Sequence, residues 1–350
     1  MKKQPNQSRI VKRKRRLRKR VYLIVIPILV ILIAATTLFV RLYLKAESVL
    51  SESYVDDGRD KSELRDDGVN PKFDNVSILL MGVDSSDKRE NTENSRTDAL
   101  MVATLNKDDK SVKLVSIPRD SLVYIPEVGY ETKINHAHAF GQEQAVIDTI
   151  EGLLEIPIDY WVRVNFDSFI DVVDALDGVT VDVPYEFTEQ DSKDRANAIH
   201  LYPGVQELDG EQALALARTR KLDNDIERGK RQQEVLKAII DRTISLKSIL
   251  KLEDVVEAVG ANLEMSMKTK EAKSFVSYGT SGKNLKIENI TLEGIDYQPG
   301  NTYFWKLDEV SLEETIKELQ EHLEYEPTNS TVENESNSST SETATPANED

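Results

Sequence analysis

A run of twenty residues without a charged side chain, Val21 to Val40, constrains this chain more than any other feature. A helix rises about 1.5 Å per residue, so the run spans roughly 30 Å, the thickness of a bilayer's hydrocarbon core. Tyr22 and Tyr43 fall where the two membrane interfaces would lie. The run is too long for the apolar part of a signal peptide, and no A-x-A-like cleavage site accompanies it. The sequence therefore predicts an uncleaved transmembrane signal anchor.

The charge on either side of this run predicts its orientation. Residues 1–20 contain eleven Lys or Arg and no acidic residue, whereas the whole chain has a net charge of −17. Positively charged flanks stay inside the cell, so residues 1–20 are predicted to be cytoplasmic and the body of the chain extracellular. The basic residues abut the apolar run directly. This favours contact with the cytoplasmic membrane and argues against nucleic acid as a partner.

The rest of the chain divides by composition. Residues 41–72 are polar and charged and are predicted to be a juxtamembrane stalk, and residues 73–325 show core periodicity throughout. Residues 326–350 are rich in Ser, Thr, Asn and Glu and contain no aromatic residue. Such a composition buries too little apolar area to fold, so they are predicted to be a disordered acidic tail. The absence of Cys excludes disulfides, thiol catalysis and Cys-ligated zinc.

Strand-like and helix-like segments alternate in the body. Apolar runs rich in β-branched residues predict strands, and the turn from Asn106 to Lys110 predicts a hairpin. The predicted strands are Val76–Val83, Ala99–Leu105, Val112–Ile117, Tyr160–Val164, Gly178–Val183 and Leu285–Leu292. The predicted helices are His136–Leu154, Ser168–Leu176 with Asp167 as N-cap, Gly210–Ala217, Ile226–Leu246, Leu252–Leu263, Thr269–Tyr278 and Lys306–Leu323. This order favours an α/β fold, a three-layer α/β/α sandwich with a central mixed sheet.

A basic segment from Ala217 to Gln233 interrupts the otherwise acidic body. Its cations are Arg218, Arg220, Lys221, Arg228, Lys230 and Arg231. Arg228 and Gln232 are four residues apart and share a helix face with the core side, so both are predicted to point inward near a helix N-terminus. Arginine suits bidentate phosphate binding. The alternative is a solvated surface with salt bridges to the acidic residues of the same segment, and the segment alone leaves both open.

Other polar side chains lie at the ends of predicted strands. Asp84 follows one strand, Arg96 and Asp98 precede the next, and Arg119 and Asp120 follow a third. Ligand sites of α/β sheets gather at strand ends, and carboxylates with arginines suit a divalent cation plus phosphate. Two histidines two residues apart, in KINHAHAFG, do not make a metal site. The sequence contains no Gly-x-Ser-x-Gly elbow and no Walker loop.

These motifs together resemble a known family. GVDSSD, NSRTDAL, SIPRDS, KINHAHAFG, GVTVDVP and ALARTRKLDNDIERGKRQQ occur in an order that is similar to the LytR-CpsA-Psr family, in particular to its polyisoprenyl-teichoic acid–peptidoglycan teichoic acid transferases. The resemblance implies a phosphotransferase outside the membrane. It would move an anionic glycopolymer from a polyprenyl-pyrophosphate carrier to the C6 hydroxyl of N-acetylmuramic acid in peptidoglycan. It also implies a hydrophobic channel for the lipid.

The resemblance also assigns site residues. It implies that pyrophosphate is bound by Arg96, Arg119, Arg218, Arg220, Arg228 and Gln232. Mg²⁺ or a similar divalent cation would be held by Asp84 and Asp98. A carboxylate near the acceptor, Asp98 or Asp84, would take the hydroxyl proton, and that assignment stays open because one aspartate cannot easily be both a tight metal ligand and the base. Lys133, Asn135 and Arg231 would give polar support. Two alternatives remain: a membrane-anchored polyprenyl-pyrophosphate hydrolase with the same cluster, and a non-enzymatic regulator of the cell envelope.

Overall fold

The computed structural model describes residues 41, 44–45, 47–83, 97–244, 263–275 and 285–327. No helix among these residues is long and apolar enough to cross a membrane. The predicted basic segment, the anchor at Val21–Val40, Asp84, Arg96, most of the predicted helix Leu252–Leu263 and the tail beyond residue 327 lie outside the described residues.

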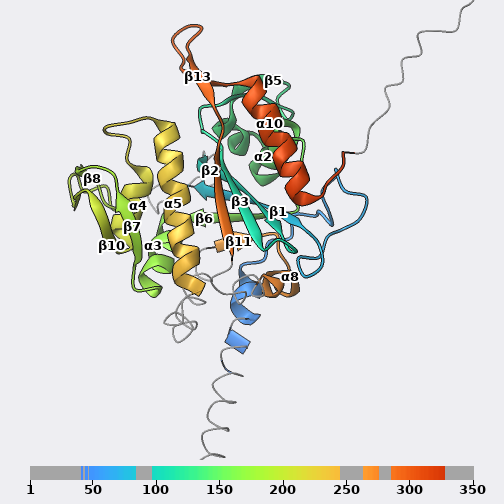
Figure 1. Cartoon of the computed structure of the whole chain (residues 1–350), viewed down its shortest axis with the longest axis horizontal. Helices are drawn as coiled ribbons and strands as arrows, with labels where there is room; N and C mark the ends of the chain where they lie inside the picture. The colour runs from blue at the N-terminus through green and yellow to red at the C-terminus, as the bar shows by residue number, and fades with distance from the viewer. Residues whose placement is uncertain are drawn as a thin grey trace, which may run out of the picture.

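A central six-stranded sheet organises the body, in the order β11-β6-β1-β2-β3-β12 (Figure 1). Its strands are β1 (Val76–Val83), β2 (Thr97–Asn106), β3 (Ser111–Ser116), β6 (Tyr160–Asn165), β11 (Leu263–Met265) and β12 (Lys286–Thr291). β2 pairs antiparallel with β1 and β3, whereas β6 pairs parallel with β1, and β12 parallel with β3. The predicted α/β fold with a mixed central sheet is confirmed, including the hairpin between β2 and β3.

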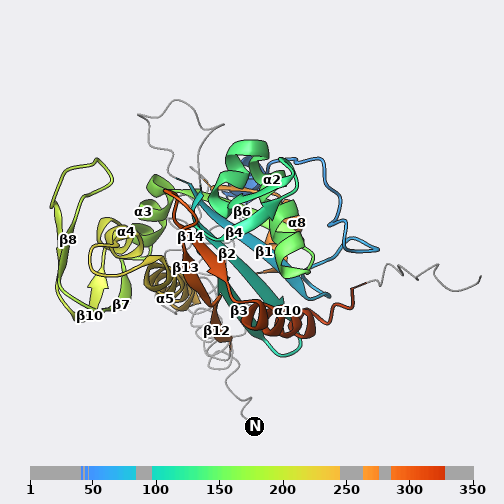
Figure 2. The same cartoon turned by 90° about the horizontal axis from the view of Figure 1, so that it is seen from above.

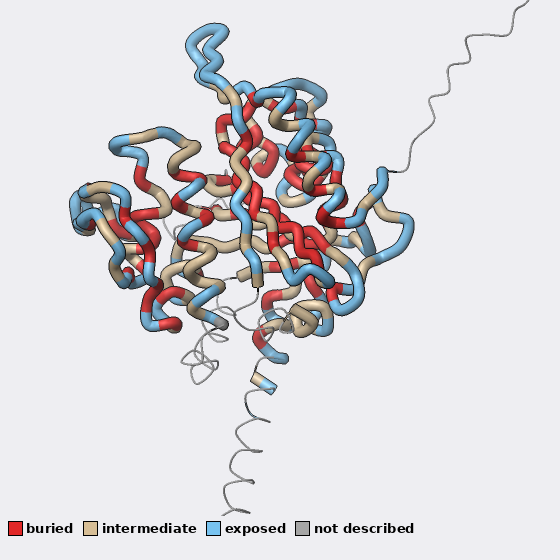
Figure 3. Tube along the Cα trace, viewed as in Figure 1, coloured by how far each residue is buried: buried red, intermediate tan, exposed pale blue. Residues whose placement is uncertain are grey.

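Helices cover both faces of this sheet. α2 (Ala137–Leu154) and α10 (Glu309–Leu323) bury Val146, Ile150 and Leu319 against one face. α5 (Asp225–Ile244) and α8 (Thr269–Ser274) contribute Leu236 and Ala272 to the core on the other. Buried residues accordingly concentrate along the sheet and beneath the helices (Figure 3). Because β1, β2 and β3 are buried along most of their length, they read as the apolar runs from which they were predicted, whereas the edge strand β12 has no buried residue.

A smaller lobe beside the sheet carries the helices that reach the site (Figure 2). It contains α3 (Phe166–Ala175), α4 (Gly210–Arg218) and the strands β7 (Val179–Val183), β8 (Phe187–Glu189), β9 (Ile199–Leu201) and β10 (Gly204–Leu208). Its core includes Val173, Leu216 and Val235, so α5 joins the lobe to the sheet. Gly210 lets α4 approach α3 closely, because a Cβ there would lie 2.5 Å from the backbone oxygen of Ile170.

Several predicted boundaries were wrong. α3 begins at Phe166 with Asn165 as its N-cap, whose side chain accepts from the Ser168 N–H at 2.8 Å, so Asp167 is not the cap. The C-terminal helix begins only at Glu309, because the residues before it form strand β14 (Phe304–Leu307). Leu263 lies in a strand, and α8 ends at Ser274. The hairpins β4 (Leu122–Ile125) with β5 (Tyr130–Lys133), β8 with β9, and β13 (Gly294–Tyr297) with β14 were not predicted, nor was β10.

The segment predicted as a stalk packs against the body over part of its length. The Arg65 guanidinium binds Asp159 through Nε and Nη2, at 2.9 and 2.8 Å. Ser62 donates to Glu151 at 2.6 Å, and the Trp161 indole donates to Asp57 at 2.8 Å. These contacts tie residues 57–65 to α2 and β6.

Candidate active site

The polar residues of the site come from the ends of five elements. Asp98 is the second residue of β2, and Arg119 and Asp120 follow the end of β3. Because β2 and β3 are antiparallel, the start of one and the end of the other meet at the same edge of the sheet. Lys133 ends β5, Arg218 ends α4 and Asp225 begins α5.

Arg119 links the sheet to the helices. Its Nη1 donates to Asp98 Oδ1 at 2.8 Å, and its Nε lies 3.8 Å from both Asp120 Oδ2 and Asp225 Oδ2. Lys133 Nζ binds Asp120 Oδ1 at 2.7 Å. Asn135, which is buried, donates its backbone N–H to the Arg119 carbonyl at 3.2 Å. The predicted supports Lys133 and Asn135 therefore hold the segment of Arg119 and Asp120 in place.

Asp225 lies at the centre of the arginines. Its Oδ1 is 3.2 Å from Arg228 Nη2 and 3.6 Å from Arg220 Nη1. Burial, together with a hydrogen bond to Asp120, raises the pKa of the Asp225 carboxyl above its ordinary value. Burial also opposes ionisation of Asp120, but its contacts with Asp225, Lys133 and Arg119 outweigh this and lower the pKa of that carboxyl. The hydrogen bond between the two carboxyls thus moves their pKa values in opposite directions.

Two buried arginines on α5 differ in what they bind. Arg228 is 5% exposed, and its Nε has no hydrogen-bond partner among the described residues. Burial, opposed by Asp225 and reinforced by Arg119 and Arg220, lowers the pKa of Arg228 to about 10. Arg231 has its donors occupied: Nε binds the Leu216 carbonyl at 3.1 Å, and the guanidinium pairs with Asp223. Arg228 therefore keeps one buried donor, its Nε, that no described residue accepts from, whereas Arg231 connects α5 to the preceding loop.

The prediction that Arg228 points inward is confirmed, and Lys230 on the same helix is exposed and pairs with Glu227 at 2.8 Å. Gln232 Nε2 donates to the Ala217 carbonyl at 3.1 Å, beside Arg218, and Gln232 is not among the residues that line the cleft. Sequence reasoning did not assign a role to Asp225 or Tyr303. Asp225 is one of the acidic residues of the basic segment that would form salt bridges on a solvated surface, and no sequence signal marks Tyr303.

The arginines border an open cleft of about 670 Å³. Its lining residues are Asp120, Glu189, Gln190, Arg218, Arg220, Lys221, Asp223, Asn224, Asp225 and Tyr303. The Arg218 guanidinium lies 5.2 Å from the centroid of the Phe166 ring. Of the predicted residues that the structure describes, Asp98, Arg119, Lys133, Arg218, Arg220 and Arg228 gather in or beside this cleft. Three cations and four carboxylates line the cleft itself, and Arg119, Lys133 and Arg228 beside it, with Asp98, bring the totals to six cations and five carboxylates. The clustered arginine donors suit the oxygens of a compact polyanion such as a pyrophosphate.

Comparison with known proteins identifies the family. A family profile described as the LytR_cpsA_psr family matches residues 40–321. The chain belongs to this family. It is 40% identical over 315 residues to the polyisoprenyl-teichoic acid–peptidoglycan teichoic acid transferase TagT of Bacillus subtilis (strain 168), covering 89% of this chain and 97% of the relative.

Solved structures of LytR_cpsA_psr relatives agree with the fold. A structure described as TagT bound to LIIa-WTA superposes with a TM-score of 0.67 at 40% identity, covering 77% of this chain and 98% of that one. A second, the LytR-CPS2A-psr family protein YwtF (TagT) with bound octaprenyl pyrophosphate lipid, gives a TM-score of 0.62 at 37% identity and covers 78% and 99%. The α/β architecture described above is thus the LytR_cpsA_psr fold.

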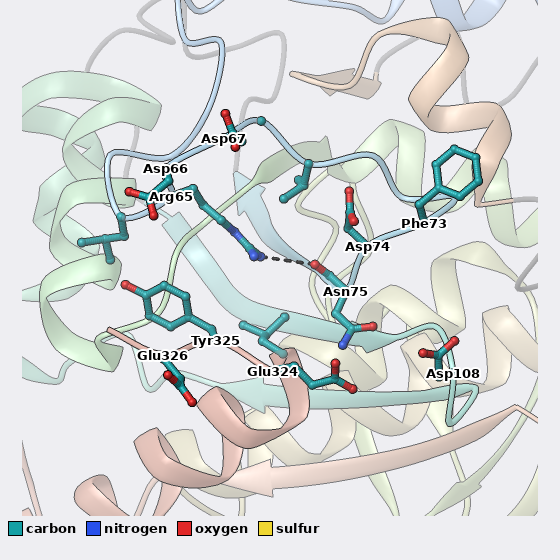
Figure 4. A pocket seen from close by; sticks show the side chains of 14 residues that line it. Arg65, Asp66, Asp67, Phe73, Asp74, Asn75, Asp108, Glu324, Tyr325 and Glu326 are labelled. Carbon is teal, nitrogen blue, oxygen red and sulfur yellow. Dashed lines mark hydrogen bonds between the residues drawn. The ribbon is translucent and has the colours of Figure 1, made fainter. Parts of the chain in front are cut away.

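A second pocket of this LytR_cpsA_psr chain lies at the opposite end of β1 and has different chemistry (Figure 4). It encloses about 430 Å³, and its lining includes the carboxylates of Asp66, Asp67, Asp74, Asp108, Glu324 and Glu326. Arg65 lies among them, with Nη2 bound to the Asn75 carbonyl at 3.2 Å. So many carboxylates repel a phosphate, so this pocket is not the pyrophosphate site.

Proposed function

We propose that this protein is a glycopolymer transferase that moves an anionic, teichoic acid-type cell-wall polymer from a polyprenyl-pyrophosphate carrier to peptidoglycan. The observation that carries the proposal is Arg228, a buried guanidinium with an unpartnered Nε among the described residues, grouped with Arg119 and Arg220. Burying a cation without full compensation is costly, and a pyrophosphate would supply the missing negative charge. The names and bound lipids of the relatives support the same substrate class.

The geometry suggests how the chain's own residues act. The arginines hold the pyrophosphate and stabilise the charge that develops as its bridging P–O bond breaks and polyprenyl phosphate leaves. The acceptor hydroxyl, which we propose is the C6 hydroxyl of N-acetylmuramic acid, attacks the phosphorus that carries the polymer and forms a phosphodiester. A carboxylate, Asp98 or Asp84, takes the hydroxyl proton.

We also propose Mg²⁺ as the cofactor, held by Asp98 and Asp84. No group of three or more His, Cys, Asp or Glu in the described part of the chain could hold a metal ion by itself. The donor set nevertheless fits, because Mg²⁺ is commonly bound by one or two carboxylates together with substrate phosphates, and Asp98 is part-exposed beside the arginines. When bound, the ion would neutralise charge on the pyrophosphate.

The metal assignment predicts that Asp98→Ala folds but loses magnesium-dependent transfer, because the ion loses one of its two protein ligands. Initial rates measured across a magnesium titration, beside the thermal midpoint, check this. A chelator should reduce the wild type to the level of the variant. Full activity of Asp98→Ala in the presence of chelator would show that Asp98 holds no essential metal.

The transferase is distinguished from a hydrolase by its acceptor. The full-length protein in detergent is supplied with a lipid-pyrophosphate-linked polymer, with and without a peptidoglycan oligomer, and the products are analysed by mass spectrometry. We expect polyprenyl phosphate to be released together with an oligomer that carries the polymer through a phosphodiester. Equal release of free polymer in both reactions would instead identify a hydrolase.

We propose a single-pass membrane topology, with residues 1–20 cytoplasmic and the body extracellular. Two observations support this topology: Val21–Val40 contains no charged residue and is long enough to span a bilayer, and the residues before it are strongly basic. External protease added to intact protoplasts is expected to release a soluble body that antibodies detect in the medium. A body that stays protected until the cells are lysed would reverse the orientation.

A further inference from the structure

The β13–β14 hairpin stands out from the body (Figure 1). The backbone N–H of Trp305 donates to the backbone carbonyl of Asp120 at 2.8 Å, and Ser121 and Trp305 form a β-bridge. Gly294 permits this packing, because a Cβ there would lie 2.7 Å from Trp305 Nε1. The hairpin is therefore attached to the segment that carries Asp120, and it brings Tyr303 to the edge of the cleft.

The ring of Tyr303 is held in place within the protein. Its hydroxyl donates to Asp296 Oδ1 across the hairpin at 2.8 Å, and the Lys133 ammonium lies 5.9 Å from the ring centroid. Tyr303 is nevertheless 36% exposed, and its neighbours on the hairpin are also exposed, Tyr297 at 38% and Ile295 at 64%. The hairpin thus presents an oriented aromatic surface to solvent beside the reacting groups.

The two walls of the cleft differ in charge. The hairpin of residues 294–307 contains two charged side chains, Asp296 and, near its end, Lys306. The segment from α4 to α5 brings the cations Arg218, Arg220 and Lys221 to the cleft, together with the carboxylates of Asp223 and Asp225. A polyanion is attracted to the cationic wall and gains nothing from the hairpin. An aromatic face bordered by a hydroxyl and a carboxylate instead suits an uncharged sugar, which packs its C–H face on the ring and hydrogen-bonds through its hydroxyls.

We propose that the β13–β14 hairpin is the acceptor subsite of the cleft, where Tyr303 and Tyr297 pack against sugar rings of a peptidoglycan glycan strand. The identity of this occupant rests on the transferase function proposed above. Tyr303 would then be a positioning residue, which orients the acceptor hydroxyl toward the pyrophosphate held on the opposite wall.

The subsite is tested by binding and by kinetics. Binding of a soluble peptidoglycan oligomer to the full-length protein is measured without donor, and transfer rates are measured while each substrate is varied. Tyr303→Ala is expected to weaken oligomer binding about five- to tenfold and to raise the KM for the oligomer by a similar factor, with the KM for the lipid donor unchanged. Tyr303→Phe keeps the ring and should restore most of the binding. Tyr202→Ala removes a tyrosine that is 58% exposed on the other lobe and is the matched control.

The outcomes separate this proposal from the transferase function. If the Tyr303→Ala variant transfers polymer and binds the oligomer as well as the wild type does, the acceptor subsite is overturned and the transferase function stands. A KM raised for the donor alone would lead to the same conclusion. Wild-type protein that binds the oligomer through Tyr303 but transfers no polymer would support the subsite and overturn the transferase.

Discussion

Replacing Arg228 with alanine is expected to slow polymer transfer about 100- to 1000-fold while the protein remains folded. The guanidinium is a preorganised positive group at the point where the departing phosphate gains charge, and its pKa of about 10 keeps it protonated at neutral pH. Without Arg228, the Asp225 carboxylate still lies 3.6 Å from Arg220 and 3.8 Å from Arg119. It therefore does not become an unpaired buried charge, and the protein should still fold. Arg218→Ala and Arg220→Ala should show losses of the same order. Initial transfer rates beside thermal midpoints measure both effects.

Two variants of the same helix serve as controls for Arg228→Ala. Lys230 is exposed and pairs only with Glu227, so Lys230→Ala should leave transfer unchanged and shift stability by about 0.5 kcal/mol or less. Arg228→Lys should recover only part of the activity, because an ammonium cannot make a bidentate contact with phosphate. Near-wild-type transfer by the three arginine variants together would reject the catalytic cluster.

Replacing Arg231 with alanine is expected to act on stability, with a loss of about 3–5 kcal/mol in the free energy of unfolding. The side chain is buried, pairs with Asp223, and binds the carbonyls of Leu216 and Thr219. Its removal leaves a largely buried carboxylate and the carbonyls at the end of α4 without their donor. Equilibrium denaturation of the two proteins measures the difference.

A matched comparison on one helix makes the Arg231 prediction specific. Arg228→Ala removes an equally buried arginine that has an unpartnered Nε among the described residues, and it should cost much less stability. Asp223→Ala should destabilise about as much as Arg231→Ala, since either change breaks the same pair, and the double variant should lose less than the sum. Equal stability of Arg231→Ala and the wild type would show that this pair contributes nothing to folding.

Helical periodicity predicted which side chains of α5 point inward, but it did not predict the residues that they bind. A face that continues into Val235 required Arg228 to point inward and Lys230 outward, and the structure agrees. The same face includes Arg231, and nothing in the spacing tells which arginine is occupied. That depends on Asp223 and on carbonyls from the loop after α4, whose path periodicity does not describe.

Burial also decided which strands could be predicted. β1, β2 and β3 are apolar on both faces and were predicted nearly to their ends. The strands around the cleft, such as YETK in β5 and GIDY in β13, are short and exposed and carry no period-2 signal. Consequently Tyr303 was missed, whereas the positions of the arginines followed from helix geometry and from strand ends.

Lipid binding in the absence of acceptor shows whether the arginine cluster binds a pyrophosphate. The affinity of the full-length protein for polyprenyl pyrophosphate and for polyprenyl monophosphate is measured in the same detergent. We expect the wild type to prefer the pyrophosphate. A variant with alanine at Arg218, Arg220 and Arg228 should lose this preference while it still binds the monophosphate. Equal affinity of the wild type for the two lipids, or an unchanged preference in the triple variant, would contradict pyrophosphate binding by the arginine cluster.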